Sequence, residues 1–405
     1  MNRPPTPSPW RILIPLGLGT CLSLVGDATL YAVLPTHTEA AGVSVASVGI
    51  LLSANRLVRL LVNGPAGVAY SRWSRRRLYV LALFIGALSS AICALSRGFW
   101  PLLVGRLLWG VSWAGIWIGG NVIVAEISDR RERGRWVGLY HGFFFLGAAG
   151  GAFVGGILTD AVGYHGTMGV AAGLTLFGAL VAQLSLPEVR SGDDGVVDPP
   201  SAPARSALHL GPATAAAFAL YGINRLVVPG VLNATLGLLL QQEVGPQIEI
   251  GGRTVGVATL TGSSLGLSTL IAMASAPILG ALSDRTSNRW TVVAAGLVAG
   301  VAGFALLSVG APWSILAGIP LTALASGSNQ SQSVTLIGDL STVDQRSKRL
   351  GLLFTLGDLG SAVGPPLAYA LIPLLGLRGN YVLSAALLLP MFLTALWFSR
   401  RRPEA

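Results

Sequence analysis

Long apolar segments separated by short polar stretches run through the whole chain. An α-helix needs about 20 predominantly apolar residues to cross a hydrocarbon core of about 30 Å, and twelve segments meet that length. They span residues 11–34, 46–70, 77–96, 99–123, 136–159, 166–186, 210–240, 257–281, 290–310, 313–337, 349–374 and 380–398. The pattern therefore predicts an all-α membrane protein with twelve transmembrane helices.

Two irregular stretches interrupt this pattern. Residues 187–209 are rich in Pro, Ser and Asp and lack apolar periodicity, which predicts a flexible cytoplasmic linker. The linker would join two six-helix bundles, residues 1–186 and residues 210–405. Residues 241–256 alternate in polarity around Gly251 and Gly252, a pattern compatible with a small external hairpin. A solvated loop is the favoured interpretation of this stretch, and a lid is the alternative.

Marked residues of the first half recur in the second half at a constant spacing of 213 positions. The matched pairs are Gly67 with Gly280, Arg72 with Arg285, Arg76 with Arg289, Trp100 with Trp313, Glu126 with Asp339, and Gly151 with Gly364. Insertions would break this register unless both halves had kept the same element lengths. Two parallel repeats place a substrate site between them, near the bilayer midplane, so the pattern indicates a transporter.

Composition and charge agree with a membrane protein. Apolar residues make up 52% of the chain and charged residues 11%, and the mean hydropathy is +0.66, which excludes an ordinary water-soluble domain. The net charge of +10 follows from topology, because 20 of the 27 basic residues fall on the side of the N-terminus. Only Arg97, Arg253 and Arg378 fall in loops on the other side.

This asymmetry matches the positive-inside rule. We therefore expect a multi-pass protein of the inner (plasma) membrane, with both termini cytoplasmic and no nucleic-acid partner. No small-residue cleavage site follows a short apolar core, so the first helix is expected to remain in place.

Residue types that mark enzymes or bound metals are sparse. Cys21 and Cys93 lie in predicted helices and are interpreted as small apolar residues. The four histidines are scattered, and no phosphate-binding GxxxxGK[ST] sequence is present. We expect no enzymatic activity, no metal and no cofactor, and ATP is not the predicted energy source.

Two loops carry a recognisable signature. Residues 67–76 read GVAYSRWSRR, and residues 280–289 read GALSDRTSNR. They resemble the major facilitator superfamily, in which a Gly is followed four residues later by an Asp-Arg pair and then by a basic cluster. The second copy keeps Asp284 and Arg285, whereas Ser71 replaces the acid in the first copy. The resemblance implies a cytoplasmic gate formed by Gly67, Arg72, Arg76, Gly280, Asp284, Arg285 and Arg289.

Two further segments are similar to the same superfamily, most of all to its twelve-helix drug:proton antiporter group. Arg106 precedes Trp109-Gly110, where the family pattern has an intramembrane Arg before Gln-Gly. Residues 147–156, GAAGGAFVGG, resemble the Gly-rich antiporter motif, with Ala152 in place of the usual Pro. Such small residues also allow close helix packing whatever the function.

Six charged residues remain inside predicted helices: Arg56, Arg59, Arg106, Arg225, Asp27 and Asp358. A charge at the bilayer centre costs roughly 2.5–3.5 kcal/mol, so such residues usually face a cavity or each other. Asp27 and Arg106 both lie seven residues from the outer ends of their helices, about 10 Å deep, which predicts a pair. The hypothesis is that Asp27 carries the proton and Arg106 holds its carboxylate ionised. A static packing pair is the alternative.

The other four charges allow two interpretations. Asp358 with Arg225 would form a second coupling pair or a structural bridge, and their depths agree less well. Arg56 and Arg59 lie three residues apart on one helix face and are interpreted as a brace between helices or between bundles.

Aromatic and polar residues are the substrate-cavity candidates. Arg106, Trp109, Trp113 and Trp117 share one helix face, and a wall of indoles suits flat, apolar or cationic molecules. Packing inside the bundle is the alternative. The candidates expected opposite this stripe are Tyr31, Tyr221, Asn224, Asn329, Gln330 and Ser333.

The sequence thus predicts a secondary transporter that alternates access, acting as a functional monomer in the lipid bilayer. Its predicted activity is proton-coupled efflux of an amphipathic small organic molecule. Four buried arginines against two buried aspartates leave an organic-anion carrier as an alternative. A non-transporting membrane sensor or assembly partner on the same scaffold is the alternative of another class.

Overall fold

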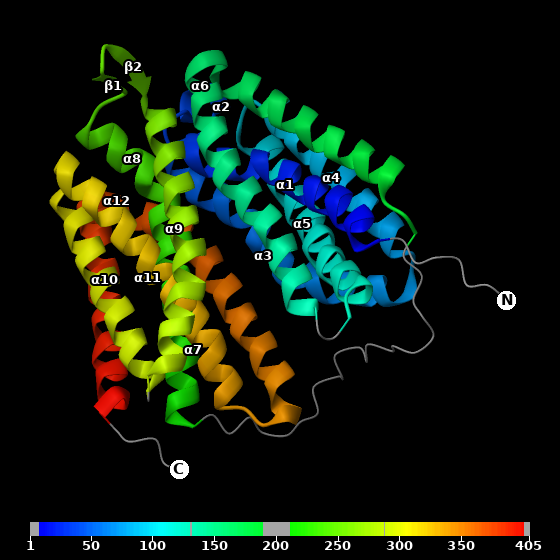
Figure 1. Ribbon diagram of the computed structural model, residues 1–405. Helices are drawn as coiled ribbons and strands as arrows, with labels where there is room; N and C mark the ends of the chain where they lie inside the picture. The colour runs from blue at the N-terminus through cyan, green and yellow to red at the C-terminus, as the bar shows by residue number, and fades with distance from the viewer. Residues whose placement is uncertain (1–7, 130–131, 189–210, 287, 401–405) are drawn as a thin grey trace.

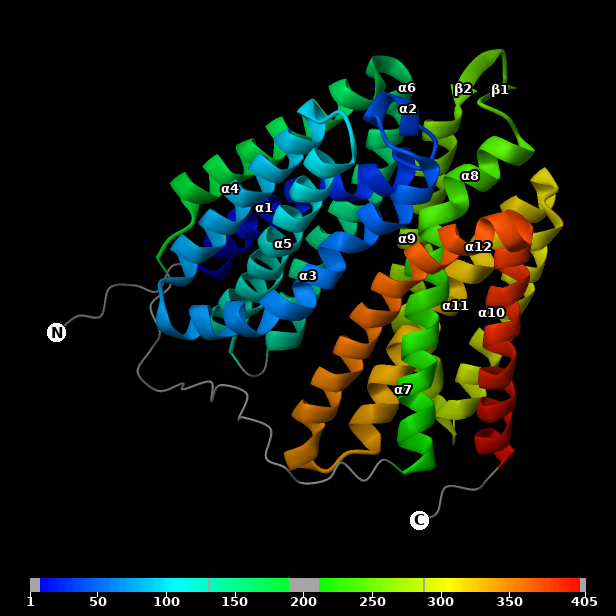
Figure 2. The same ribbon diagram turned by 180° about the vertical axis from the view of Figure 1, so that it is seen from behind.

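The computed structural model describes residues 8–129, 132–188, 211–286 and 288–400. In this part of the chain, helices and one small hairpin form two bundles that meet side by side (Figures 1 and 2). The fold is the predicted all-α membrane architecture. The division into domains at the linker stays a prediction, because the linker lies almost wholly outside the described residues.

The first bundle contains six helices as the structure delimits them. They are α1 Pro9–Val33, the short α2 Thr38–Ala41, α3 Val45–Arg72, α4 Arg75–Leu95, α5 Phe99–Ile127 and α6 Arg133–Ser185. α6 is two membrane-length segments joined at Gly163, whose φ of 76° breaks the helical path. Glycine tolerates this left-handed conformation without a Cβ clash, so the chain turns back at Gly163.

The second bundle follows the same plan with one insertion. Its elements are α7 Pro212–Arg225, the π-helix η1 Leu226–Leu232, α8 Asn233–Glu243, strands β1 Gln247–Ile250 and β2 Arg253–Gly256, then α9 Val257–Arg285, α10 Arg289–Val309, α11 Pro312–Asp339 and α12 Val343–Arg400. β1 and β2 form an antiparallel hairpin that turns at Gly251 and Gly252, both with positive φ, in agreement with the alternating pattern of the sequence. α12 bends at Gly376 with a φ of 69°.

The twelve predicted crossings correspond to these elements. α7, η1 and α8 together make one crossing, and Gly163 and Gly376 each divide a long helix into two. By length and composition, nine helices in the described ranges qualify as membrane-spanning. α11 is not among them, and its middle reads SGSNQSQS over residues 326–333.

Close helix contacts at glycine hold each bundle together. A Cβ on Gly151 of α6 would lie 2.7 Å from Cα of Val25 on α1. In the second bundle, a Cβ on Gly364 of α12 would lie 2.5 Å from Cα of Gly230 in η1. No side chain fits at either point, so the Gly-rich segments bring backbones into contact, as small residues do in membrane helices.

The two bundles touch at the end that carries the hairpin, called here the hairpin end. A Cβ on Gly156 of α6 would lie 2.3 Å from the carbonyl oxygen of Ala258 on α9, and one on Gly49 of α3 would lie 2.8 Å from that of Pro365 on α12. Toward the opposite end, the Cβ positions of Gly67 on α3 and Gly142 on α6 have no neighbouring atom within 4 Å. The bundles therefore diverge away from the hairpin end (Figure 2).

Candidate functional site

Asp27 and Arg106 form an ion pair inside the first bundle. Nη1 of Arg106 on α5 lies 2.6 Å from Oδ1 of Asp27 on α1, and the same oxygen accepts a bond of 3.4 Å from Nδ2 of Asn55 on α3. Arg106 is 1% exposed, whereas the Asp27 side chain is 19% exposed. The carboxylate is therefore the more accessible member of the pair.

The pair is tied to α3 by a second bond. Nε of Arg106 donates to the carbonyl oxygen of Leu51 over 3.0 Å, while its buried Nη2 has no hydrogen-bond partner. The ring of Tyr31 lies close to two guanidiniums, with Cζ of Arg56 at 5.1 Å and Cζ of Arg106 at 5.9 Å from its centroid. Both distances suit cation–π contact, so Tyr31 links the first pair to the bundle interface.

Arg56 and Arg59 extend from α3 to the second bundle. Nη1 of Arg56 donates to the carbonyl oxygens of Pro229 in η1, at 3.0 Å, and Ser361 on α12, at 2.8 Å. Arg59 forms an ion pair with Asp358 on α12. Every one of these bonds crosses between the bundles.

The π-helix explains why carbonyls are available there. Pro229 has no N–H, so the helix around it cannot satisfy all its acceptors. The hydroxyl of Ser361 approaches the carbonyl oxygen of Arg225 at 3.4 Å, and Arg56 takes up that of Pro229. Residues of both bundles thus complete the broken helix.

The structure corrects the expected partner of Asp358. Its carboxylate meets Arg59 of the first bundle rather than Arg225 of its own bundle. Arg225 instead lies over Gly357, one turn from Tyr221, and its buried Nε has no hydrogen-bond partner. Depth along single helices did not distinguish the two arginines, because Arg59 reaches Asp358 across the interface.

The tryptophan stripe lies mostly inside the first bundle. Trp109 and Trp113 are 2% and 7% exposed and pack in a hydrophobic cluster with Tyr79 and Leu83 of α4. Their rings stack at 5.9 Å, and Trp117 continues the stack at 5.7 Å from Trp113. Trp109 and Trp113 are therefore core residues rather than a cavity wall, because the indoles point toward α4 and α6.

Trp117 is half-buried and stacks on the imidazole of His141 at 5.1 Å, a neighbour that sequence reasoning missed.

The polar candidates of the second bundle differ from one another in their surroundings. Asn224 donates to the carbonyl oxygen of Ser326 over 3.3 Å, and Ser333 bonds within its own helix. Asn329 is fully buried toward Gly296, whereas Gln330 is exposed. Asn329 and Ser333 therefore lie in the bundle interior rather than at a cavity surface.

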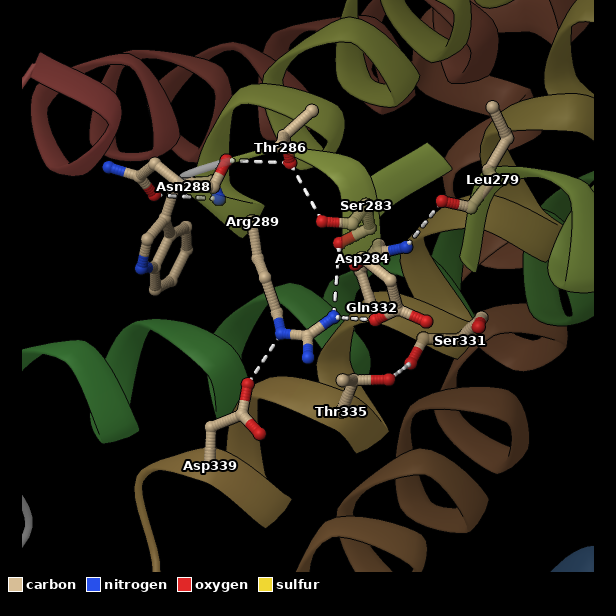
Figure 3. A network of polar contacts seen from close by, with 11 residues as sticks. Leu279, Ser283, Asp284, Thr286, Asn288, Arg289, Ser331, Gln332, Thr335 and Asp339 are labelled. Atoms are coloured by element: carbon tan, nitrogen blue, oxygen red, sulfur yellow. Dashed lines mark hydrogen bonds and ion pairs between the residues drawn. The ribbon is translucent and has the colours of Figure 1, made fainter. Parts of the chain in front are cut away.

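The second copy of the loop signature forms a charge network within one bundle (Figure 3). Arg289 at the start of α10 bonds Asp284 of α9 at 2.6 Å and Asp339 of α11 at 2.5 Å. Arg285 is exposed and Gly280 faces Ser331. In this conformation the bonds of Arg289 join three helices of the second bundle.

The first copy is shifted by one residue. Arg75, not Arg76, pairs with Glu126 of α5 at 2.5 Å, and Arg76 donates to the carbonyl oxygen of Gln183 on α6. Gly67 and Arg72 lie at the open end of the molecule, and Arg72 is exposed. Because Ser71 carries no carboxylate, the first copy lacks a counterpart of the ion pair between Asp284 and Arg289.

Asp160 is a second residue that the sequence did not single out. Its Oδ2 accepts a bond of 2.9 Å from the backbone N–H of Thr259, in the first turn of α9. Gly256, the residue before α9, has no side chain to cap this helix. The carboxylate of one bundle therefore caps a helix of the other at the hairpin end. His37 lies near Asp160, and burial lowers the pKa of its imidazole.

Metal-binding and cofactor-binding arrangements are not apparent in the residues that the structure describes. No group of three or more His, Cys, Asp or Glu side chains is placed to hold a metal ion there. The prediction that the chain needs no cofactor stays a prediction.

Sequence comparison places the chain in a known group. The family model for the Major Facilitator Superfamily matches residues 16–251 and 211–405. A tetracycline resistance protein of class C from Escherichia coli is 25% identical over 89% of both chains. One of class G from Vibrio anguillarum is 26% identical over 86% of this chain and 85% of its own.

A probable 4-methylmuconolactone transporter from Cupriavidus pinatubonensis is 32% identical over a shorter stretch, 29% of this chain and 27% of that protein.

Solved structures of other transporters share the fold of this chain. A bacterial homolog of the human lysosomal transporter Spinster, in an inward-facing and occupied conformation, covers 98% of each chain with a TM-score of 0.83 and 15% identity. A human organic anion transporter covers 97% of this chain and all of its own, with a TM-score of 0.65 and 20% identity.

Proposed function

The chain belongs to the major facilitator superfamily and is a multi-pass membrane transporter rather than an enzyme, and we propose that it exports an amphipathic small organic molecule in exchange for protons. The efflux direction is supported by its similarity to two tetracycline resistance proteins. In this proposal the hairpin end faces outward and the open end faces the cytoplasm, in keeping with the distribution of basic residues.

The observation that carries the proton coupling is the ion pair of Asp27 and Arg106. Its carboxylate is partly accessible and its guanidinium is almost completely buried. Protonation of Asp27 removes the charge that compensates Arg106, and an uncompensated buried charge is costly. Binding of one proton to Asp27 therefore destabilises the present arrangement of α1, α3 and α5 and favours a rearranged one.

The helix α3 is the element that passes this change to the second bundle. Asn55 contacts Asp27, and the next residue, Arg56, contacts the second bundle through two carbonyls. A shift of α3 that follows protonation would loosen the bonds of Arg56 and Arg59 across the interface. Weaker bonds across the interface would allow the two bundles to rotate relative to each other, which is the motion that alternating access requires.

Transport by the purified protein in proteoliposomes tests this proposal. Lipophilic cations and organic anions are added while internal pH is followed, and Asp27→Asn is compared with the wild type. We expect the variant to lose substrate-driven proton movement but to keep substrate exchange when the pH is equal on both sides. Glu39→Gln is the matched control, since Glu39 is an exposed carboxylate at the hairpin end.

Proton movement that survives in Asp27→Asn would exclude Asp27 as the carrier and leave the pair a static packing contact. Loss of both activities, with the control unaffected, would indicate a structural role instead. Absence of flux for any compound in the wild type would contradict the transport proposal itself.

A further inference from the structure

Charges at the interface between the bundles do not balance. Four arginines and two aspartates lie in the membrane-spanning segments; the pair of Arg106 with Asp27 lies inside the first bundle, and the pair of Arg59 with Asp358 crosses the interface. Arg56 and Arg225 have no carboxylate partner among the described residues. Two positive charges therefore remain uncompensated by protein groups near the middle of the membrane, where each is expensive.

The two arginines without a carboxylate partner, Arg56 and Arg225, differ in the contacts that their guanidiniums make. Arg56 gives Nη1 to two carbonyls and faces the ring of Tyr31. Arg225 has neither an ion pair nor a hydrogen bond to its buried Nε. Arg225 is half-buried, and an external anion would supply the acceptor that its Nε lacks.

Arg56 and Arg225 lie in one neighbourhood although they belong to different bundles. Ser361 connects them, because its carbonyl oxygen accepts from Arg56 while its hydroxyl approaches the carbonyl of Arg225. Both guanidiniums are positively charged, so they repel each other. An anion placed beside Arg225 would offset this repulsion and would accept a hydrogen bond from the Arg225 guanidinium.

An apolar groove of about 350 Å³ follows the same two helices. Its wall is formed by Phe218, Gly222 and Leu226 of α7 and by Leu356, Gly360 and Val363 of α12. Gly222 and Leu226 flank Arg225 in the sequence, and Arg225 packs over Gly357 of α12. Arg225 does not line the groove itself, so a molecule whose apolar body fills the groove would have to extend its charged end along α7 to meet the guanidinium.

We propose that the transported molecule is an amphiphilic organic anion whose carboxylate or similar group binds Arg225, with Arg56 adding positive potential and the α7–α12 groove receiving the apolar body. This inference rests on the proposed function and specifies its substrate class. It gives Arg225 a role in specificity rather than in proton coupling.

Three probes of equal shape and different charge test the proposal: naphthylbutyrate, naphthylbutyramide and naphthylbutylamine. Their affinities for the purified full-length protein are measured by fluorescence, and their fluxes are measured in proteoliposomes. We expect the carboxylate to bind tightest. Arg225→Gln should weaken its binding by about tenfold to a hundredfold, the range expected for loss of a charge-assisted hydrogen bond, and leave the neutral amide within about twofold.

Thermal unfolding without ligand separates this role from a structural one. Arg225 has no ion pair to lose, so Arg225→Gln should unfold at the same temperature as the wild type or higher, and Arg225→Lys should recover part of the carboxylate affinity. Arg253→Gln, at an exposed arginine in the hairpin, is the matched control. A lower unfolding temperature with equal weakening of all probes would overturn the proposal.

Failure of the two proposals can be told apart. Equal affinity for the three probes, or binding of none, would overturn the anion site, even if other compounds are transported. Preferred binding of the carboxylate that depends on Arg225, without any proton-coupled flux, would uphold the site and contradict the proposed transport function.

Discussion

Single residues in this protein owe their roles to their partners across helices, which a linear sequence does not display. Equal depth was enough to predict that Asp27 and Arg106 meet, because both lie on helices of one bundle. The partner of Asp358 was not predictable in this way, since Arg59 reaches it from the other bundle. The facing of the tryptophan stripe was equally hidden, because periodicity places residues on one face without saying what that face contacts.

Replacement of Trp113 tests the structural role of the stripe. Trp113→Ala should lower the free energy of unfolding by about 3–5 kcal/mol, because it removes a buried ring stacked between Trp109 and Trp117. Denaturation in detergent measures this loss. Trp313→Ala, at a tryptophan that is 65% exposed, should change the free energy by about 0.5 kcal/mol or less. Unchanged stability together with weaker substrate binding would return Trp113 to the cavity wall.

Helices and their ends were the most predictable level of the structure. Apolar length located nearly every crossing within a few residues, and positive-φ glycines at Gly163, Gly251, Gly252 and Gly376 explain the turns between elements. The π-helix η1 was not predicted, because Pro229 in a transmembrane helix is compatible with several local distortions. The cap that Asp160 gives to α9 was not predicted either, since an acid near a helix end is ordinary.

The cap makes a prediction at the level of an element. Asp160→Asn should weaken the bond to the first turn of α9 by about 1 kcal/mol, which shifts a two-state equilibrium about fivefold toward separation of the hairpin end. Spin labels at Glu39→Cys and Gln242→Cys, one on each bundle, would report a larger population of long distances. Glu249→Gln in the hairpin serves as the control. An unchanged distance distribution would mean that the cap does not contribute to closure.

The arrangement of the whole molecule was predictable from the repeat and from the basic residues, but its orientation in the membrane stays a prediction. With Cys21 and Cys93 replaced, Arg253→Cys should react with a membrane-impermeant thiol reagent from outside intact cells. Arg285→Cys, at the opposite end, should react only after permeabilisation. Labelling in the reverse order would invert the topology and with it the proposed direction of transport.

The constant spacing between the halves has one more consequence, which concerns temperature. It maps Arg59 and Asp358, which join α3 to α12, onto Ala272 of α9 and Phe145 of α6. If the two halves exchange roles during transport, ionic bonds close one end of the molecule and apolar contacts close the other. Apolar association weakens on cooling, so the balance between the two states would be set in part by heat, with cold favouring the conformation held by charge.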